Sequence, residues 1–250
     1  MAGQLIVGIH AVRAALKHGA QQVEAVWFDA ARNDRRLRQL LDEARSAGVK
    51  VQPSDKGALD RMTGGANHQG VVAHGEMPTS LGEAALERLL NALDEPPFLL
   101  VLDGITDPHN LGACLRSAEG AGVHAVIAPR DRASGLTPVV CKVASGAAET
   151  MPFVQVTNLV RTLRYLQDSH RVFVVGADGA ADDELYRLDL TGPLALVMGS
   201  EGEGMRRLTR ESCDRLARLP MRGQVESLNV SVATGVCLYE ALRQRTAGPI

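Results

Sequence analysis

The chain has 250 residues, of which 45% are apolar, so it is long enough for one large domain or two small domains with a buried core. Its formal net charge of −2 gives no sign of a nucleic-acid partner, and no apolar run approaches the roughly 20 residues that cross a bilayer. Its four cysteines lie far apart, which excludes a dense disulfide framework and a paired-cysteine metal site, so we expect a reduced, cytoplasmic protein without a metal or membrane partner.

The first 76 residues alternate between helical and strand patterns. Apolar residues recur at helical spacing in three segments and form short strand-like runs in three others. Asn33 or Asp34 is predicted to cap the second helix, which Gly48 ends. The predicted helices cover 8–19, 33–48 and 55–65, and the predicted strands cover 23–29, 49–53 and 68–75. These elements predict a compact α/β domain over residues 1–76.

The next segment changes character. One amphipathic helical pattern is bracketed by Pro78 and by the pair Pro96 and Pro97. Because proline cannot continue a helix, this arrangement is typical of a linker. We therefore predict a linker over residues 77–96.

From residue 97 to residue 250 the alternation of strands and helices restarts. The strand-like runs are almost continuously apolar, as expected for strands buried on both faces of a parallel sheet. The predicted strands cover 97–105, 124–129, 171–178, 193–200 and 215–221, and the predicted helices cover 110–122, 156–169 and 227–245. This order predicts an α/β domain with a mostly parallel sheet, in which ligands bind at the carboxyl ends of the strands.

The first of three loops that follow such strands leads into NLGACLRSA. Asn110 is a good helix N-cap, and the small residues Gly112 and Ala113 would let a ligand approach the positive end of the helix. Arg116 lies in mid-helix without an acidic residue before Glu119. Taken alone, Arg116 is either a surface residue or a cation that reaches back over the loop.

The second loop, MGSEGEG, contains Gly199, Gly202 and Gly204. Three glycines in six residues indicate a tight turn where the backbone approaches a ligand or a second backbone. Neither a Walker A sequence nor GxGxxG occurs, which argues against an ordinary nucleotide site. Glu201 is either a ligand-binding carboxylate or an acid favoured by a helix N-terminus.

The third loop, LPMRGQVESLNVSVA, begins with a rigid apolar edge at Leu219 and Met221. Ser227 and Asn229 then flank Leu228 at the mouth of an apolar helix. Helix N-capping would explain one of these two polar residues, but the presence of both indicates that they have another role as well.

The three loop sequences, in this order and each after a buried strand, resemble motifs 1, 2 and 3 of the SpoU branch of the SPOUT RNA methyltransferases. GIHAV, NHQGVVA and CKVASGAAE extend the resemblance over nearly the whole chain. The resemblance implies an L30e-like RNA substrate-binding domain, followed by a SPOUT catalytic domain with a deep C-terminal trefoil knot. It further implies a homodimer, S-adenosyl-L-methionine as cofactor, and 23S rRNA or a large-subunit assembly intermediate as partner. The implied reaction is methylation of a guanosine ribose 2′-hydroxyl in the peptidyl-transferase loop that holds P-site tRNA.

The resemblance also implies roles for individual residues. The cofactor would contact Gly199, Leu219, Met221 and Leu228, and Glu201 would help to shape the site. Arg116 would be a fixed cation beside the ribose, because arginine hardly ever gives up its proton. Asn110, Ser227 and Asn229 would position Arg116 and the ribose. The resemblance does not identify the general base.

Three alternatives remain at this point. A tRNA or another rRNA ribose 2′-O-methyltransferase would carry the same motifs. A non-catalytic RNA-binding protein would rely on the first domain alone. A nucleotide-dependent metabolic enzyme would need one of the phosphate-binding sequences that are missing here.

Overall fold

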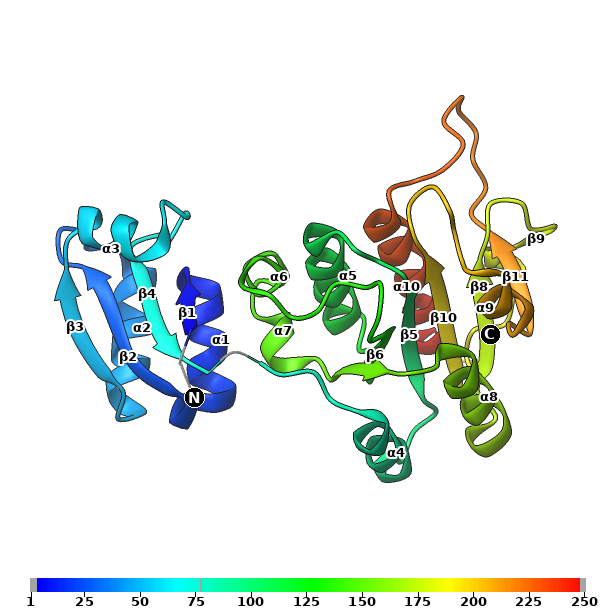
Figure 1. The fold of residues 1–250 in the computed structure, drawn as a ribbon, viewed down its shortest axis with the longest axis horizontal. Coiled ribbons are helices and arrows are strands. Elements are labelled where there is room, and N and C mark those ends of the chain that lie inside the picture. Colours follow the sequence, from blue (N-terminus) through cyan, green and yellow to red (C-terminus); the bar gives the residue numbers. More distant parts are fainter. Residues whose placement is uncertain (1–3, 77, 248–250) are drawn as a thin grey trace. The chain divides into compact units, whose positions relative to one another are not determined.

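The computed structural model describes residues 4–76 and 78–247 and divides the chain into two compact units (Figure 1). Unit 1 consists of Met1–Thr79 and Leu136–Thr150, and unit 2 consists of Ser80–Gly135 and Met151–Ile250. Residue 77, where the predicted linker begins, and both chain ends lie outside the described residues. The predicted domain bounds stay a prediction, but the helix expected in the linker belongs to unit 2 and segment 136–150 belongs to unit 1.

Unit 1 is built on a mixed sheet of four strands in the order β1-β4-β2-β3. β4 pairs antiparallel with β1 and with β2, whereas β2 and β3 are parallel. The strands are β1 (Gln4–Val7), β2 (Val23–Asp29), β3 (Lys50–Ser54) and β4 (Val71–Gly75). The helices are α1 (Ile9–Gly19), α2 (Arg35–Ser46), α3 (Lys56–Thr63), α6 (Pro138–Ala144) and α7 (Ala147–Thr150), with a 3-10 turn at Ala20–Gln22. The predicted elements of the first 76 residues are thus confirmed.

The core of unit 1 forms where α1 and α2 pack against the sheet. Val12 and Leu40 are fully buried there against Val26 and Val71. Of the two predicted caps of α2, Asn33 or Asp34, the structure has Asp34, whose side chain accepts hydrogen bonds from the backbone N–H groups of Arg36 and Leu37. Amphipathic helices on one face of a sheet bury enough apolar area to hold so small a unit together.

Unit 2 is built on a sheet of seven strands in the order β7-β6-β5-β10-β8-β11-β9, and every pairing in it is parallel. The strands are β5 (Phe98–Asp103), β6 (Ala125–Pro129), β7 (Phe153–Val156), β8 (Phe173–Ala177), β9 (Asp183–Glu184), β10 (Leu194–Gly199) and β11 (Arg215–Arg218). The helices are α4 (Glu83–Ala92), α5 (Pro108–Gly120), α8 (Leu159–His170), α9 (Arg207–Glu211) and α10 (Val230–Thr246), with a 3-10 turn at Leu185–Arg187. The mostly parallel α/β sheet is confirmed.

Helices cover both faces of this sheet. Leu86 of α4 and Leu163 of α8 pack in one core cluster with Val101 and Val197 of the central strands. α10 contacts β10 and α5, and alternation of side chains along the strands assigns those two helices to the opposite face (Figure 1). Among the helices of the described residues, none is long and apolar enough to pass through a bilayer. Those residues also contain no cluster of three metal-ligating side chains.

Candidate active site

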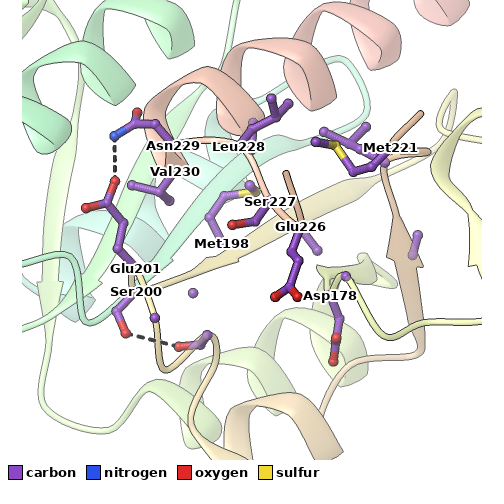
Figure 2. Close-up of a pocket in the computed structure, with 18 residues that line it drawn as sticks. Asp178, Met198, Ser200, Glu201, Met221, Glu226, Ser227, Leu228, Asn229 and Val230 are labelled. Carbon is purple, nitrogen blue, oxygen red and sulfur yellow. Dashed lines mark hydrogen bonds between the residues drawn. The ribbon is translucent and has the colours of Figure 1, made fainter. Parts of the chain in front are cut away.

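A cleft of about 460 Å³ lies at the carboxyl ends of β8, β10 and β11 in unit 2 (Figure 2). Because these strands are parallel neighbours, the loops that leave them meet at one edge of the sheet. The lining comes from the loops after all three strands and from the start of α10. Seven residues predicted for the site line this cleft, namely Gly199, Glu201, Leu219, Met221, Ser227, Leu228 and Asn229.

The loop after β10 is a tight hairpin. Ser200 and Gly204 exchange two backbone hydrogen bonds of 3.0 Å, and Gly202 and Gly204 have positive φ angles of 83° and 70°. A Cβ atom on Gly199 would lie 2.2 Å from the backbone carbon of Gly204, so only glycine fits there. The glycines of this loop therefore allow two backbone segments to touch, and the hairpin presents Glu201 at its tip.

The loop after β11 supplies the apolar wall of the cleft. Met221 and Leu228 remain 37% and 38% exposed, which is high for large apolar side chains in a folded protein. Together with Leu219 they face the same cleft as the hairpin. Such partly exposed side chains are suited to contact a flat, weakly polar group such as a nucleobase.

One network of hydrogen bonds joins the three loops. The Asn229 amide nitrogen donates to Asn110 Oδ1 at 3.0 Å. Through a short contact it also donates to Glu201 Oε1 (Figure 2). Its Oδ1 atom accepts the backbone N–H of Ser231 at 3.0 Å and caps α10. Asn229 thus uses both ends of its side chain and connects residues that are 119 and 28 positions away.

The predicted capping role of Asn110 is wrong. α5 begins earlier, because Asp107 caps it by accepting the backbone N–H of His109 and Pro108 occupies its first turn. Pro108 favours this earlier start, since its fixed φ suits the first helical position. Asn110 instead lies inside the helix, is 7% exposed, and receives the hydrogen bond from Asn229.

Arg116 does not join this network within one chain. Its side chain is exposed on α5, and it is absent from the lining of the cleft. Residues 110 and 116 are six positions apart, about 240° around a helix, so they do not share a face. The described residues contain no hydrogen bond from Asn110, Ser227 or Asn229 to Arg116.

Sequence reasoning missed two acidic residues of the cleft, Asp178 and Glu226 (Figure 2). Burial acts to raise the pKa of Asp178, but the hydrogen bond from Arg210 Nε at 2.6 Å and the charge of Arg210 hold that pKa below its ordinary value. Asp178 is thus a stable anion at neutral pH. Its position directly after the buried strand β8 was the signal that could have identified it.

The lining fits S-adenosylmethionine. An apolar wall suits the adenine ring, and the exposed backbone of the hairpin offers groups for hydrogen bonds. The carboxylates of Asp178, Glu201 and Glu226 suit a ligand that carries a sulfonium and an ammonium group. Gly199 and Gly204 line the cleft, and the close contact between their backbones fixes the hairpin at its edge.

Comparisons with known proteins agree with this site. Residues 97–239 match the SpoU rRNA Methylase family, and residues 5–81 match the family described as RNA 2′-O ribose methyltransferase substrate binding. A 23S rRNA (guanosine-2′-O-)-methyltransferase RlmB from Ralstonia nicotianae is 56% identical over 98% of each chain. The enzyme of the same name from Yersinia pestis is also 56% identical, over 97% of this chain and 98% of its own.

Solved structures give the same result. The SpoU methyltransferase AviRb from Streptomyces viridochromogenes, in complex with the cofactor AdoMet, has a TM-score of 0.80 and 26% identity, covering 99% of this chain and 92% of its own. An RNA 2′-O ribose methyltransferase has a TM-score of 0.79 and 28% identity, covering 98% of this chain and 89% of its own. The family predicted from the three motifs is confirmed: the chain belongs to the SpoU rRNA methylase family.

Proposed function

We propose that this chain transfers a methyl group from S-adenosylmethionine to the ribose 2′-hydroxyl of a guanosine in 23S rRNA. The observation that carries the proposal is the hydrogen-bond network of Asn229, Asn110 and Glu201, which joins all three motifs beside a cleft suited to the cofactor. The names of the relatives that are 56% identical support the same substrate. The AdoMet complex of AviRb supports the cofactor.

The chemistry explains why the site needs fixed polar groups. A ribose 2′-hydroxyl is almost never ionised at neutral pH, so its attack requires alignment and stabilisation of the negative charge that develops on oxygen. S-Adenosylmethionine, when bound, supplies a methyl group that is activated by the adjacent sulfonium. Asn110, Ser227 and Asn229 orient the ribose, while Glu201 holds the Asn229 amide in place. Gly199, Leu219, Met221 and Leu228 hold the cofactor.

Arg116 supplies the stabilising cation, and we propose that it acts on the site of a second copy in a homodimer. Arg116 is exposed and does not line the cleft of its own chain. α5 and α10 pack against each other, and α10 also exposes apolar side chains, with Val232 50% and Tyr239 52% exposed. A second copy that covers this face would bury these side chains and bring an Arg116 to the site.

Arg116→Ala tests this role. The variant should bind S-adenosylmethionine normally by calorimetry and lose methyl transfer by about two to three orders of magnitude, the scale of removing one charge-stabilising group. Near-normal turnover would refute the role of Arg116.

A mixing experiment tests whether Arg116 acts across the dimer. Glu201→Ala should be inactive alone, as should Arg116→Ala. After both are unfolded and refolded together, mixed dimers should regain methyl transfer, because one of their two sites then has an intact Glu201 and an intact Arg116. Mixtures as inactive as the separate variants would show that Arg116 acts within its own chain.

Three structural parts of the proposal rest on the family. Residues 1–76 form an L30e-like RNA-binding domain, residues 77–96 a linker, and residues 97–250 the SPOUT catalytic domain. Segments 198–204 and 219–229 belong to a trefoil knot. The knot is supported by the fact that both segments line the same cleft. Such threading is rare, because protein chains seldom pass through their own loops.

The target is a guanosine in the peptidyl-transferase loop that holds P-site tRNA, modified in the cytoplasm on 23S rRNA or on a large-subunit assembly intermediate. Mapping 2′-O-methyl groups in rRNA from a strain that lacks this protein tests the assignment. Loss of one rRNA guanosine methylation is expected. Loss of a tRNA methylation instead would favour the tRNA alternative, and no change would favour a non-catalytic RNA-binding protein.

A further inference from the structure

Asp103 is a buried carboxylate at the carboxyl end of β5, and its side chain is 0% exposed. Its Oδ2 atom accepts the backbone N–H of Arg206 at 2.8 Å. Its Oδ1 atom has no hydrogen-bond partner in the described part of the chain, and Arg206 Nε lies 3.4 Å from it. Because a buried charge without a counter-charge is costly, the guanidinium of Arg206 is needed beside Asp103. One carboxylate therefore holds both the backbone and the side chain of Arg206.

The Arg206 guanidinium lies beside Gly104, the first residue after β5, at the carboxyl edge of the sheet. The Arg206 side chain is 45% exposed, and its Nη2 atom is 3.6 Å from the position that a Cβ atom on Gly104 would occupy. The Cβ atom of Ser200 lies 4.0 Å from that same position. Arg206 and Ser200, the residue that precedes Glu201, therefore both lie near Gly104 at this edge of the sheet.

The backbone beside this guanidinium is held in place by a neighbouring loop. Gly104 has a φ of +84°, and the carbonyl oxygen of Arg132 lies 3.9 Å from the same Cβ position. The loop that carries Arg132 is fixed to the loop after β5 by a hydrogen bond from Ser134 N to Ile105 O at 2.8 Å. Asp103 contacts both the backbone N–H and the guanidinium of Arg206, so this cation has a preferred position beside that backbone.

We propose that Arg206 binds a phosphate of the RNA backbone beside the reacting ribose and that Asp103 is the residue that positions it. Asp103 approaches the Nε edge of the guanidinium, which leaves the Nη1 and Nη2 groups to form the two-pronged contact that arginine makes with phosphate. The ribose carbon with the 2′-hydroxyl is bonded to the carbon that carries the 3′-phosphate. Fixing that phosphate therefore limits where the hydroxyl can lie. This inference rests on the proposed function, since it assigns the RNA contact of the same site.

The chain offers a matched control in Arg207, the next residue. Arg207 is 75% exposed and pairs with Glu211 of its own helix at 2.8 Å, away from Asp103. Arg206→Ala should weaken binding of an unmodified 23S rRNA transcript by about tenfold, typical of a lost contact with a charged group. It should also reduce the slope of log affinity against log salt by about one unit. Cofactor binding by calorimetry should change less than twofold, and Arg207→Ala should leave affinity and slope near the wild-type values.

Three results would overturn the proposal. Equal RNA affinity and salt slope in Arg206→Ala and Arg207→Ala would show that Arg206 makes no specific contact. Loss of cofactor binding together with a lower melting temperature in Arg206→Ala would make Arg206 a structural residue only. Full rescue by Arg206→Gln, which lacks the charge, would exclude a phosphate contact. Failure of the proposed function is a separate outcome, because the wild-type chain would then transfer no methyl group to rRNA.

Asp103→Asn tests the positioning role. The amide oxygen can still accept the backbone N–H of Arg206, so that backbone contact is kept, but the counter-charge for the guanidinium is lost. RNA affinity should fall toward that of Arg206→Ala, and the double variant should bind RNA no more weakly than Arg206→Ala alone. Additive losses in the double variant would show that Asp103 does not act through Arg206.

Discussion

At the scale of single residues, Asn229 combines two roles that are usually separate. Its Oδ1 atom caps α10, and its amide nitrogen binds Asn110 and Glu201 from the other two motifs. The capping bond fixes the orientation of the amide plane, so the same bond that stabilises the helix also aims the amide hydrogens. Stability and geometry of the site are therefore coupled through one side chain.

Asn229→Ala should separate these roles when it is compared with Asn158→Ala. Asn158 caps α8 by accepting the backbone N–H of Arg161, and it is not part of the cleft. Each substitution should lower the free energy of unfolding by about 1 kcal/mol, the usual value of an N-cap. Only Asn229→Ala should also reduce methyl transfer by about 100-fold, because the reacting groups lose their alignment. Similar turnover in both variants would contradict the role of the network; denaturant unfolding and a methyl-transfer assay measure the two effects.

At the scale of secondary-structure elements, the sequence predicted what depends on local pattern. The buried strands β5, β6, β8 and β10 are continuous apolar runs, and their order was enough to place the loops with the site residues at one edge of a sheet. β7 (Phe153–Val156) was not predicted, because its apolar run is short. The start of α5 was misplaced because Asn110 competed with the Asp107-Pro108 pair, which caps the helix.

Contacts between distant segments could not be read from the sequence. The link between Asp103 and Arg206 spans 103 positions, and no periodicity or turn signal reports it. Segment 136–150 joins unit 1 through contacts of α7 with α1 and of α6 with β1, although it connects two strands of the sheet in unit 2. The sequence left Arg116 as either a surface residue or a cation that reaches back over the loop, because helical spacing alone does not tell what covers a face; the structure places it on the exposed face of α5.

The exposed face of α5 and α10 is the surface that we propose a second copy covers. α10 has apolar side chains on its exposed side, where Val232 and Tyr239 are separated by two helical turns, in addition to those that it buries against the sheet. Tyr239→Asp should convert the proposed homodimer to a monomer, because an aspartate cannot be buried there without a partner. Tyr186→Asp is the control, since Tyr186 is 47% exposed in the 3-10 turn at Leu185–Arg187, outside these two helices.

Analytical ultracentrifugation of both variants measures this effect. Tyr186→Asp should remain a dimer. If Arg116 acts on the site of the second copy, the monomeric Tyr239→Asp variant should also be unable to transfer a methyl group. A dimer that survives in Tyr239→Asp would place the interface on another face.

At the scale of the whole molecule, the two units have ionisable groups that respond to pH in opposite directions. In unit 1, burial raises the pKa of Glu149 to about 7 from its ordinary 4.5, and its Oε2 atom has no hydrogen-bond partner in the described part of the chain. In unit 2, hydrogen bonds from Thr157 and the charge of Arg161 hold the pKa of Glu83 below its ordinary value. The folded state therefore favours a protonated Glu149 and an ionised Glu83.

Glu149→Gln should become more stable relative to the wild type as the pH rises from 4.5 to 7. In this window the unfolded chain releases the Glu149 proton while the folded chain keeps it, so the wild type loses stability that the glutamine variant retains. At pH 8 the gain should be about 3 kcal/mol, since each pKa unit corresponds to about 1.4 kcal/mol. Glu83→Gln should show the opposite sign, with a loss of stability at pH 8 that shrinks as acid protonates the wild-type carboxylate. Urea unfolding at pH 5 and pH 8 measures the free energy of unfolding of both variants. If Glu149→Gln is more stable than the wild type by the same amount at both pH values, the cause is relief of packing strain and not removal of a buried charge.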